Sequence, residues 1–288
     1  MSFKLKSGIV YSHLDKILFP ESHISKLSII KYYQRVAPLL LFFIKNRPMV
    51  MRRFPDGISS NGFYQKQISD FFPKWIKHLS VDLKKGNKQD LVIINNQRSL
   101  LYLANLATIE FHAWLSLAQS VTTPDKIVFD LDPDNNSTKQ LCIIAFALKK
   151  IIEQHDLVPF VMTTGSRGYH VVIPIVPNHS FEEIHDFAHY IAQQVEELYP
   201  HMCTIKASKK ERKSKIFIDY LRNSYGQTSI TPYSLRARPR ATIATPLSWE
   251  ELKKTAPDKY SIGTIFQRLS KKQDPWKFFF KSAKLVKL

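Results

Sequence analysis

Apolar positions along the chain recur with two different spacings. Short runs rich in β-branched and aromatic residues predict strands, and longer segments with apolar residues three or four positions apart predict helices. The predicted strands span residues 49–54, 91–94, 126–132, 160–164, 169–175 and 215–221. The predicted helices span residues 100–116, 139–155 and 181–199, with a further helix that starts at residue 25 and is kinked or broken at Pro38. A short helix is also expected after Ser248, because Glu250 and Glu251 occupy its favourable first turn.

The run KIVFDLDP at residues 126–133 carries two aspartates one residue apart. Alternate residues of a strand share a face, so Asp130 and Asp132 would present their carboxylates side by side before Pro133 ends the strand. Neighbouring carboxylates suit hard divalent cations, and such sites leave positions open for phosphate oxygens. Taken alone, the same residues are more often a strand that exits into a polar turn, since DPDNNS follows.

The composition indicates a folded protein with a polyanionic partner. A chain of 288 residues, 44% of them hydrophobic, is long and apolar enough to bury a full core. Its 42 Lys and Arg against 24 Asp and Glu leave a formal charge of +18. Nucleic acid is the leading candidate, because phosphate neutralisation by Lys and Arg supplies most non-specific affinity. A membrane is not expected, since the apolar run LLLFFI at residues 39–44 is too short to span a bilayer.

The chain has two cysteines, Cys142 and Cys203, which lie far apart and lack the spacing of a zinc site. Such sparse cysteine usage fits a reducing cytoplasm, with each side chain a small buried residue. The N-terminal MSFKLKSG is basic but lacks the apolar core of a secretory signal. We therefore expect a cytoplasmic, nucleoid-associated protein.

The turn GSRG between the predicted strands at 160–164 and 169–175 is a second informative feature. Ser166, Arg167 and the nearby His170 can all donate hydrogen bonds to phosphate, and small glycines allow a backbone to approach an anion. An ordinary hairpin turn with an exposed arginine is the competing interpretation. The run KIFIDYL at 215–221 adds Asp219, a third carboxylate that could complete a two-metal site.

Aromatic and basic residues extend the candidate site. In GFYQK, Phe63 and Tyr64 lie beside Lys66, so rings that stack on bases would lie beside a cation for the backbone, although one ring can equally be a core residue. His112 falls in a predicted helix, where a lone histidine is more often a core residue than a ligand. The basic run at residues 205–214 is either a solvated loop or a track for DNA.

Nine short segments, taken in order, resemble the polymerase domain of bacterial ligase D, the end-joining branch of the archaeo-eukaryotic primase superfamily. They are DKILFP, GFYQK, ANLATIEFHAWLS, FDLDP, TTGSRGYHV, KIFIDYLRN, GQT, PYSLRARP and DPW. The resemblance spans residues 14–279 and implies an α/β (α+β) primase-polymerase fold, with helices flanking an antiparallel sheet like that of an RNA-recognition motif. It implies one catalytic domain over residues 1–288, with a portion that binds DNA and the 5′ phosphate at 1–90 and a catalytic core at 91–288.

The resemblance also implies roles for single residues. Asp130, Asp132 and Asp219 would hold two divalent metal ions, manganese or magnesium, bridged by a nucleoside triphosphate. The implied nucleotide-binding residues are Ser166, Arg167 and His170 of the family's GS[RK]G-x-H element, His112 near the sugar, Arg236, Gln227 and Asn223. The implied DNA-binding residues are Phe63 and Tyr64 against the template, together with Arg52 and Lys66.

At the N-terminus, family members bind the 5′ phosphate of a gap or broken end through an asparagine and two lysines. Lys16 and Lys26 match the lysines. The usual NPDK is HLDK here, so His13 replaces the asparagine and would make this contact sensitive to pH.

The resemblance implies an enzyme that extends a primer 3′ hydroxyl at gaps or double-strand breaks in bacterial non-homologous end joining, with ribonucleotides preferred over deoxyribonucleotides. No ligase or phosphoesterase motif is found, so a free-standing polymerase that relies on Ku and on a separate ATP-dependent DNA ligase is expected. Two alternatives stay open. A primase of the same superfamily is disfavoured by the lack of zinc-binding cysteines, and a binding module without catalysis is disfavoured by the three aspartates.

Overall fold

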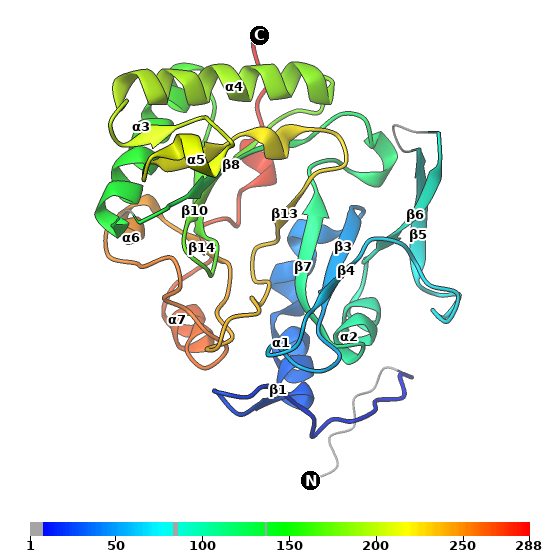
Figure 1. Ribbon diagram of the computed structural model, residues 1–288. Coiled ribbons are helices and arrows are strands. Elements are labelled where there is room, and N and C mark those ends of the chain that lie inside the picture. Colours follow the sequence, from blue (N-terminus) through cyan, green and yellow to red (C-terminus); the bar gives the residue numbers. More distant parts are fainter. Residues whose placement is uncertain (1–7, 83–85, 136) are drawn as a thin grey trace.

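The computed structural model describes residues 8–82, 86–135 and 137–288, and two six-stranded sheets organise this part of the chain (Figure 1). The first, here called the catalytic sheet after the three aspartates that are expected to be catalytic, has the strand order β11-β12-β8-β10-β9-β14 and is antiparallel except for the β11–β12 pair. Its strands are β8 (Lys126–Asp132), β9 (Phe160–Thr163), β10 (Tyr169–Pro174), β11 (Cys203–Thr204), β12 (Ile216–Asp219) and β14 (Thr245–Leu247). Helices α3 (Thr138–Gln154) and α4 (Phe181–Leu198) cover one face of this sheet.

Alternation along the strands separates the two faces of the catalytic sheet. Phe129 of β8 packs in the core beneath α3 and α4, whereas Val128 belongs to the core on the opposite face. Asp130 and Asp132 share the face of Val128 because side chains alternate. His170 of β10 lies directly opposite Asp130 in the antiparallel register. The period-two pattern thus turns the carboxylates away from the helices and toward the second sheet.

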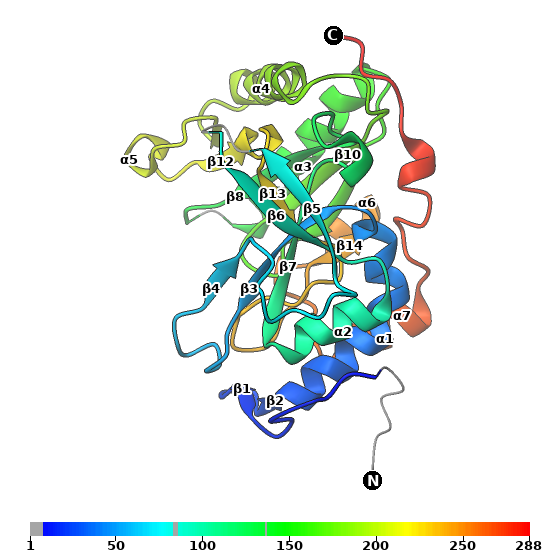
Figure 2. The same cartoon turned by 90° about the vertical axis from the view of Figure 1, so that its right-hand side faces the viewer.

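The second sheet has the order β13-β7-β3-β6-β5, with β4 paired to β3. Its strands are β3 (Pro48–Arg53), β4 (Phe63–Gln65), β5 (Lys77–Asp82), β6 (Lys88–Ile93), β7 (Thr108–Trp114) and β13 (Thr228–Ile230). Figure 1 shows it to the right of the catalytic sheet, with α1 (Lys26–Ile44) running behind it and α2 (Gln97–Asn105) at its lower end; Figure 2 shows the same arrangement from the side. Because β7 and β13 pair with N-terminal strands, the expected division at residue 90 does not separate the sheets.

Helix α1 is a core helix. The Ser25 side chain caps it by accepting a hydrogen bond from the Ser28 amide, and the helix continues through Pro38 rather than breaking there. Among the described residues, α1 is long and apolar enough to cross a membrane by those measures alone, but 56% of that stretch is buried inside the protein. The Tyr33 hydroxyl donates to the carbonyl of Ile109 in β7, which anchors the helix within the fold.

The predicted helix at residues 100–116 is wrong. Helix α2 ends at Asn105, Ala107 adopts a left-handed conformation (φ 58°), and β7 begins at Thr108. The reversal has neither glycine nor proline to mark it, so the apolar positions seemed to continue one helix. The alternation of buried Ile109 and Phe111 with polar neighbours is instead the period of a strand.

The remaining predicted elements are confirmed within a few residues at their ends. Within GFYQK, residues Phe63–Gln65 form β4, because their backbone pairs with β3. Ser248 caps α6 (Trp249–Leu252) through a capping box with Glu251. The other elements are β1 (Ile17–Phe19), β2 (Ile24–Ser25), α5 (Lys209–Arg212), α7 (Ile265–Lys271) and the 3-10 turns at Ala118–Ser120, Leu221–Asn223 and Phe280–Ser282.

Candidate active site

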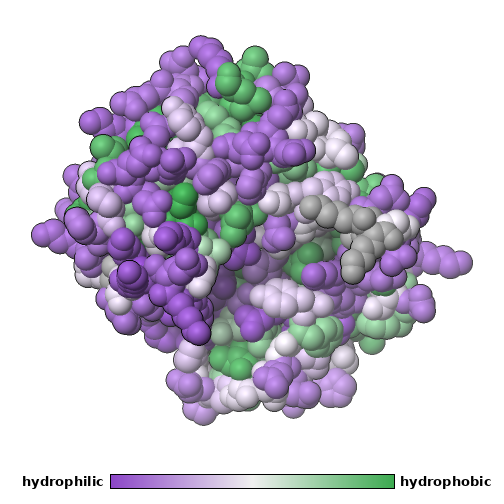
Figure 3. Space-filling view, turned by 45° about the horizontal axis from the view of Figure 1, so that its top comes forward, coloured by the Kyte–Doolittle hydropathy of each residue, from purple (hydrophilic) through white to green (hydrophobic). Residues whose placement is uncertain are grey.

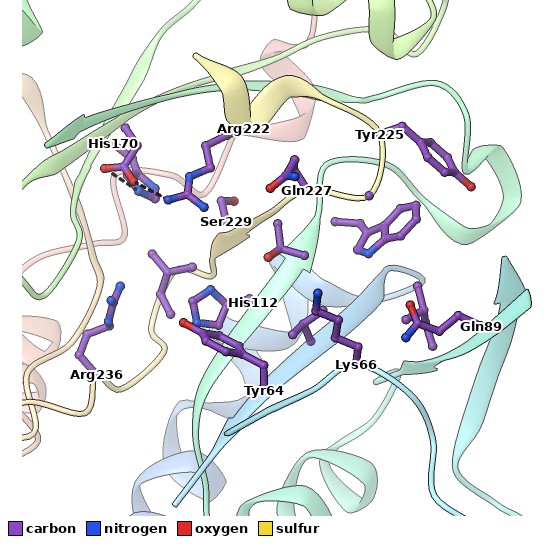
Figure 4. A pocket seen from close by; sticks show the side chains of 17 residues that line it. Tyr64, Lys66, Gln89, His112, His170, Arg222, Tyr225, Gln227, Ser229 and Arg236 are labelled. Atoms are coloured by element: carbon purple, nitrogen blue, oxygen red, sulfur yellow. Dashed lines mark ion pairs between the residues drawn. The ribbon is translucent and has the colours of Figure 1, made fainter. Parts of the chain in front are cut away.

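A cavity of about 460 Å³ lies where the two sheets face each other (Figure 4). The catalytic sheet contributes Asp130 and His170 to its wall, and the second sheet contributes strands β3, β4, β6, β7 and β13. Seven residues expected from the sequence line it: Tyr64, Lys66, His112, Asp130, His170, Gln227 and Arg236. Hydrophilic residues dominate the face shown in Figure 3, which is hollowed near its centre. The fold therefore brings nucleotide-side and DNA-side candidates into one space.

The three candidate aspartates come from two adjacent strands. Asp219 of β12 lies directly opposite Asp130 of β8 in the antiparallel register, and Asp132 lies two residues further along β8. Directly opposed side chains of an antiparallel pair share a face and lie close together. The structure thus brings Asp219 beside the two carboxylates that share β8.

Arginines neutralise all three carboxylates. Arg222 Nε lies 3.1 Å from Asp219 Oδ2 and its Nη2 lies 3.6 Å from Asp130 Oδ2, so one guanidinium bridges the pair. Asp132 pairs with Arg212 at 3.1 Å and with Arg167 at 3.5 Å. Within the described ranges, no group of three or more His, Cys, Asp or Glu side chains is arranged to hold a metal ion. The bridging guanidinium nevertheless shows that Asp130 and Asp219 converge on one cationic position with hard oxygen donors, which fits a divalent metal.

The pKa values of the two opposed aspartates move in opposite directions. Burial raises the pKa of Asp219, and of its charged neighbours Arg222 opposes this shift while Asp130 adds to it. Burial would also raise the pKa of Asp130, but His170 and then Arg222 outweigh it and lower the pKa overall. Two carboxylates this close demand a compensating cation.

The GSRG turn joins β9 to β10 as a hairpin, and its glycines serve packing within the protein. A Cβ at Gly168 would lie 1.9 Å from the carbonyl oxygen of Leu131, and one at Gly165 (φ 65°) would lie 2.7 Å from the carbonyl carbon of Ile243. The turn can therefore lie directly against the strand of the aspartates. The exposed Arg167 of this turn reaches Asp132, so the turn is a hairpin that faces the carboxylates, and its contact with phosphate stays a prediction.

His170 and Ser166 take different positions around this turn. His170 is buried, with Nε2 3.4 Å from Asp130 Oδ1, and its Nδ1 has no hydrogen-bond partner among the described residues. A buried polar atom without a partner costs about 1–3 kcal/mol, so a ligand that satisfies it would be favoured. The Ser166 hydroxyl accepts a hydrogen bond from Arg238 Nη2 at 2.7 Å and lines a smaller hollow with Arg167.

A buried carboxylate, Glu110, organises the opposite wall. Its side chain is 2% exposed and lies 3.0 Å from His112 Nε2, 3.2 Å from Arg236 Nε and 3.5 Å from Arg52 Nη1. The amide of Ala237 also donates to it. Burial would raise the pKa of Glu110, but His112, Arg236 and the amide outweigh it and hold the pKa well below its usual range. Glu110 is thus an anion that orients three of the predicted site residues.

Aromatic side chains extend from this wall toward solvent. Phe63 and Tyr64 are 46% and 53% exposed, so the alternative that one of them is a core residue is wrong. Tyr64 forms an edge contact with the His112 ring, and the Arg52 guanidinium lies 5.4 Å from the centre of the Tyr64 ring. Lys66 follows on the same cavity wall. Tyr64, Arg52 and Lys66 form a basic, aromatic surface of the kind that single-stranded nucleic acid stacks on, whereas Phe63 faces the other side of β4, beside Arg53.

Asn223 and Gln227 differ in position. Gln227 lines the cavity, whereas Asn223 is fully buried. The side-chain oxygen of Asn223 accepts a hydrogen bond from the backbone amide of Val128, and its side-chain nitrogen donates to the carbonyls of Val128 and Tyr220. These bonds tie the segment after β12 to β8. Its expected contact with nucleotide stays a prediction.

The three residues expected at a 5′ phosphate lie together near β1, at the lower end of Figure 1. The Lys26 amide bonds to the Lys16 carbonyl, and the Lys16 amide bonds to the His13 carbonyl. Burial, followed by the charge of Lys16, lowers the pKa of Lys26. Lys16 Nζ pairs with Asp56 at 2.9 Å. Within the described part of the chain the two lysines share no acidic partner, so their position favours an anion.

Sequence reasoning singled out neither Glu110 nor Arg222 as a site residue. Glu110, His112 and Trp114 alternate with buried apolar residues in β7, and that period of two was the available signal. No comparable signal marks Arg222, because it lies in a 3-10 turn whose direction depends on the β8–β12 register. The basic run at residues 205–214 is not wholly solvated, since Arg212 is 14% exposed and pairs with Asp132.

Comparison with curated proteins relates the chain to one family of enzymes. It is 33% identical over 241 residues to the "Multifunctional non-homologous end joining protein LigD" of Mycolicibacterium smegmatis, covering 83% of this chain and 32% of that protein. It is 31% identical over 274 residues to the protein of the same name from Pseudomonas aeruginosa, covering 94% of this chain and 32% of that protein. It is 29% identical over 275 residues to the "Bifunctional non-homologous end joining protein LigD" of Bacillus subtilis, covering 94% of this chain and 44% of that protein. The chain therefore spans less than half the length of these relatives.

A solved structure and a family model give the same answer. The "Polymerase Domain from Mycobacterium tuberculosis Ligase D in complex with DNA" superposes with a TM-score of 0.89 at 28% identity, covering 96% of this chain and 99% of that one. The expected α/β fold with antiparallel sheets is thereby confirmed. Residues 25–276 match the model described as "LigD, primase-polymerase domain". The chain belongs to the LigD primase-polymerase domain family.

Proposed function

We propose that this protein is a nucleotidyltransferase that extends a DNA primer from its 3′ hydroxyl, and that it does so at gaps or broken ends during non-homologous end joining. One observation carries the proposal: a single cavity joins Asp130 and His170 of the catalytic sheet to Tyr64, Lys66 and His112 of the second sheet. A templated polymerase needs this combination, because it must hold a charged nucleotide and a template base at the same time. The names of the relatives, all end-joining proteins, support the setting.

Asp130, Asp132 and Asp219 would hold divalent metal ions, manganese or magnesium. Such ions, when bound, favour deprotonation of the 3′ hydroxyl and neutralise the leaving pyrophosphate. The residues that surround the aspartates would do the remaining work. Arg167 and Arg222, whose present partners are the aspartates, would be free to pair with phosphate oxygens once other cations neutralise those carboxylates. His170 would satisfy its unpartnered nitrogen on the same group.

The walls of the cavity would orient the bound nucleotide. Glu110 holds Arg236 and His112 at fixed positions, so the triphosphate side and the sugar side of the nucleotide would be positioned by one buried anion. Tyr64 and Phe63 would stack on template bases, with Arg52 and Lys66 near the backbone. Gln227 would contribute a neutral donor and acceptor to the same wall.

Ribonucleotides would be the preferred substrates, and His112 would contact the sugar. Its ring lies against Tyr64 and is fixed by Glu110, so a 2′ hydroxyl beside it would gain a hydrogen bond. Extension of one gapped template with ribonucleotides and with deoxyribonucleotides tests this point. A clear preference for deoxyribonucleotides contradicts it.

Primer extension on a gapped duplex, with and without a 5′ phosphate on the downstream strand, tests the proposed setting. Lys16, Lys26 and His13 would bind that phosphate, so its presence is expected to stimulate extension in manganese. Extension that ignores the phosphate, or synthesis that starts without a primer, would indicate a primase instead. We further propose that a separate ATP-dependent DNA ligase and Ku act with this protein in the bacterial cytoplasm, at the nucleoid.

A further inference from the structure

A second concave surface lies on the far side of the catalytic sheet from the cavity. It is a groove of about 600 Å³ along the outward face of α3, closed at its edges by Tyr199 after α4 and by Lys253 after α6. The inward face of the same helix, including Leu141 and Ile144, packs on the sheet. The groove and the cavity are therefore separated by the helix and by the sheet itself.

The floor of the groove is apolar although it is open to solvent. Ile143, Phe146 and Ala147 of α3 are half-buried. The Phe146 ring packs against Trp249 at 5.4 Å, and Lys253 Nζ lies 5.4 Å from the centre of that ring. Phe146 and Ala147 pack partly against the edge of the core, yet they and Ile143 keep part of their surface on the outward face of α3, where a surface helix normally places polar residues.

The rim of the groove is positively charged and uncompensated. Lys139, Lys150 and Lys253 are exposed, and they form no ion pair with any residue in the described part of the chain. Lys149, next to Lys150 in sequence, instead pairs with Glu153. Lys139, Ile143, Phe146 and Lys150 follow one stripe of the helix, with the two apolar residues between the two lysines. The lysines at its ends lie roughly 16 Å apart along the helix axis, given the rise per residue.

We propose that this groove, here called the α3 groove, docks an acidic peptide segment of a separate protein, with apolar side chains on the floor and carboxylates against the lysine rim. Charge complementarity and the apolar floor each restrict the occupant. Phosphates of a nucleic acid would pair with the lysines but would leave Ile143 and Phe146 exposed. A bilayer does not fill a concave groove, and a second copy of a chain with a net charge of +18 would meet the rim with like charge.

The position of the α3 groove gives the docking a use. A partner bound there would not obstruct the cavity or the aromatic surface at Tyr64, because both lie on the other side of the catalytic sheet. The docked protein would be held beside the enzyme while DNA is engaged. This inference does not depend on the proposed function, since it rests on residues outside the candidate active site.

Binding of a fluorescein-labelled acidic peptide to the full chain tests the proposal by fluorescence anisotropy. The probe has about twelve residues, which matches the length of the α3 stripe as a helix. It consists of aspartate and glutamate, with leucine, phenylalanine and leucine placed three to four positions apart. A second probe carries alanine at those three positions. The groove variants are Lys139→Glu/Lys150→Glu and Phe146→Ala, and the matched control Lys271→Glu/Lys281→Glu makes the same charge change elsewhere.

The apolar probe is expected to bind about 10-fold more tightly than its alanine version, and each groove variant is expected to weaken it by about 10-fold or more. The control pair is expected to change affinity by less than about 2-fold. If Phe146→Ala fails to fold, Ala147→Glu replaces it, because it puts an anion into the groove at a half-buried helix position.

Three results would overturn the proposal. If the control variant Lys271→Glu/Lys281→Glu lowers the affinity for the probe as much as the groove variants do, the binding reflects only attraction to the net charge of the protein. Unchanged binding to Phe146→Ala and to Ala147→Glu would remove the apolar floor from the interaction. Displacement of the probe by a short DNA duplex as readily as by unlabelled peptide would assign the lysines to phosphates. Primer extension by the groove variants is expected to match the wild type, so the outcome is independent of the enzyme assay.

Discussion

The guanidinium of Arg236 lies 3.2 Å from the carboxylate of Glu110, although 126 residues separate them in the sequence. Glu110 lies in β7 and Arg236 in the segment after β13, and the pairing of those two strands brings them together. The same carboxylate holds His112, so one buried anion fixes two of the groups expected to contact the nucleotide, while its contact with the DNA-side Arg52 is longer, at 3.5 Å. Loss of its charge should therefore affect nucleotide use more than DNA binding.

Glu110→Gln is expected to raise the KM for nucleotide by about 10-fold or more, because hydrogen bonds to charged groups contribute about 1.5–3 kcal/mol. Steady-state extension kinetics measure the KM, and anisotropy with labelled gapped DNA should show affinity within about 2-fold of the wild type. Glu182→Gln, at an exposed position of α4, is the matched control. An unchanged KM in a folded Glu110→Gln protein would remove Glu110 from the site.

The packing of the GSRG turn against β8 predicts intolerance of any side chain at Gly168. A Cβ there would meet the Leu131 carbonyl oxygen at 1.9 Å, and both are backbone positions that cannot give way cheaply. Gly168→Ala is expected to lower the free energy of unfolding by about 1–3 kcal/mol and to reduce extension with it. Gly263→Ala, where the nearest atom would be 3.9 Å away, is the control. Urea unfolding measures the free energy of unfolding of both variants, and a Gly168→Ala protein as stable as Gly263→Ala would disprove the close approach of Gly168 to Leu131.

Lys126 predicts a pH dependence of stability. Burial, and then the charge of Arg47, lowers the pKa of Lys126 to about 7, while Asp125 opposes the shift. Between that value and the pKa of about 10.4 in the unfolded chain, the unfolded state binds more protons, so the free energy of unfolding rises with pH. Lys126→Met should remove this pH dependence. The variant should therefore have the higher free energy of unfolding at pH 7, and its advantage over the wild type should shrink by pH 9. If the free energies of unfolding of variant and wild type, measured in urea, instead change with pH in parallel, Lys126 stays protonated in both the folded and the unfolded state and the prediction is wrong.

The ion pair between Lys16 and Asp56 predicts an effect at the candidate 5′-phosphate position. Asp56→Asn releases Lys16, and exposed pairs of this kind contribute about 0.2–1 kcal/mol. The variant is therefore expected to bind 5′-phosphorylated gaps about 2- to 5-fold more tightly, without a change for unphosphorylated gaps. Lys16→Ala should abolish the difference between the two DNAs. Titration by anisotropy decides, and the assignment fails if Lys16→Ala retains full discrimination.

Local patterns in the sequence predicted the parts of the site that share one strand or one turn. Asp130 and Asp132 lie on one face because strands alternate, and the GSRG hairpin follows from two strands joined by a short turn. The resemblance to ligase D polymerases then placed Asp219, Arg236 and His112 beside them. Each of these steps needed only neighbouring residues or the order of the motifs.

Pairings between distant segments could not be predicted in this way. Asp219 faces Asp130 only because β12 and β8 adopt one particular register, and Arg222 bridges them only as a consequence. Glu110 was missed because the reversal at Ala107 uses a left-handed alanine, for which the sequence carries no turn residue. Gly168 was expected to make room for an anion, whereas its position against Leu131 depends on how the hairpin lies on β8.

Extension of a primer on a gapped, 5′-phosphorylated duplex in manganese by the wild type and by Asp130→Ala tests the central claim most directly. Asp186→Ala, an exposed aspartate on α4, is the matched control. Asp130→Ala should lose all extension and keep most of its affinity for the duplex, while Asp186→Ala should retain both. Extension by Asp130→Ala at the wild-type rate would contradict the assignment of this cavity as the active site of a polymerase.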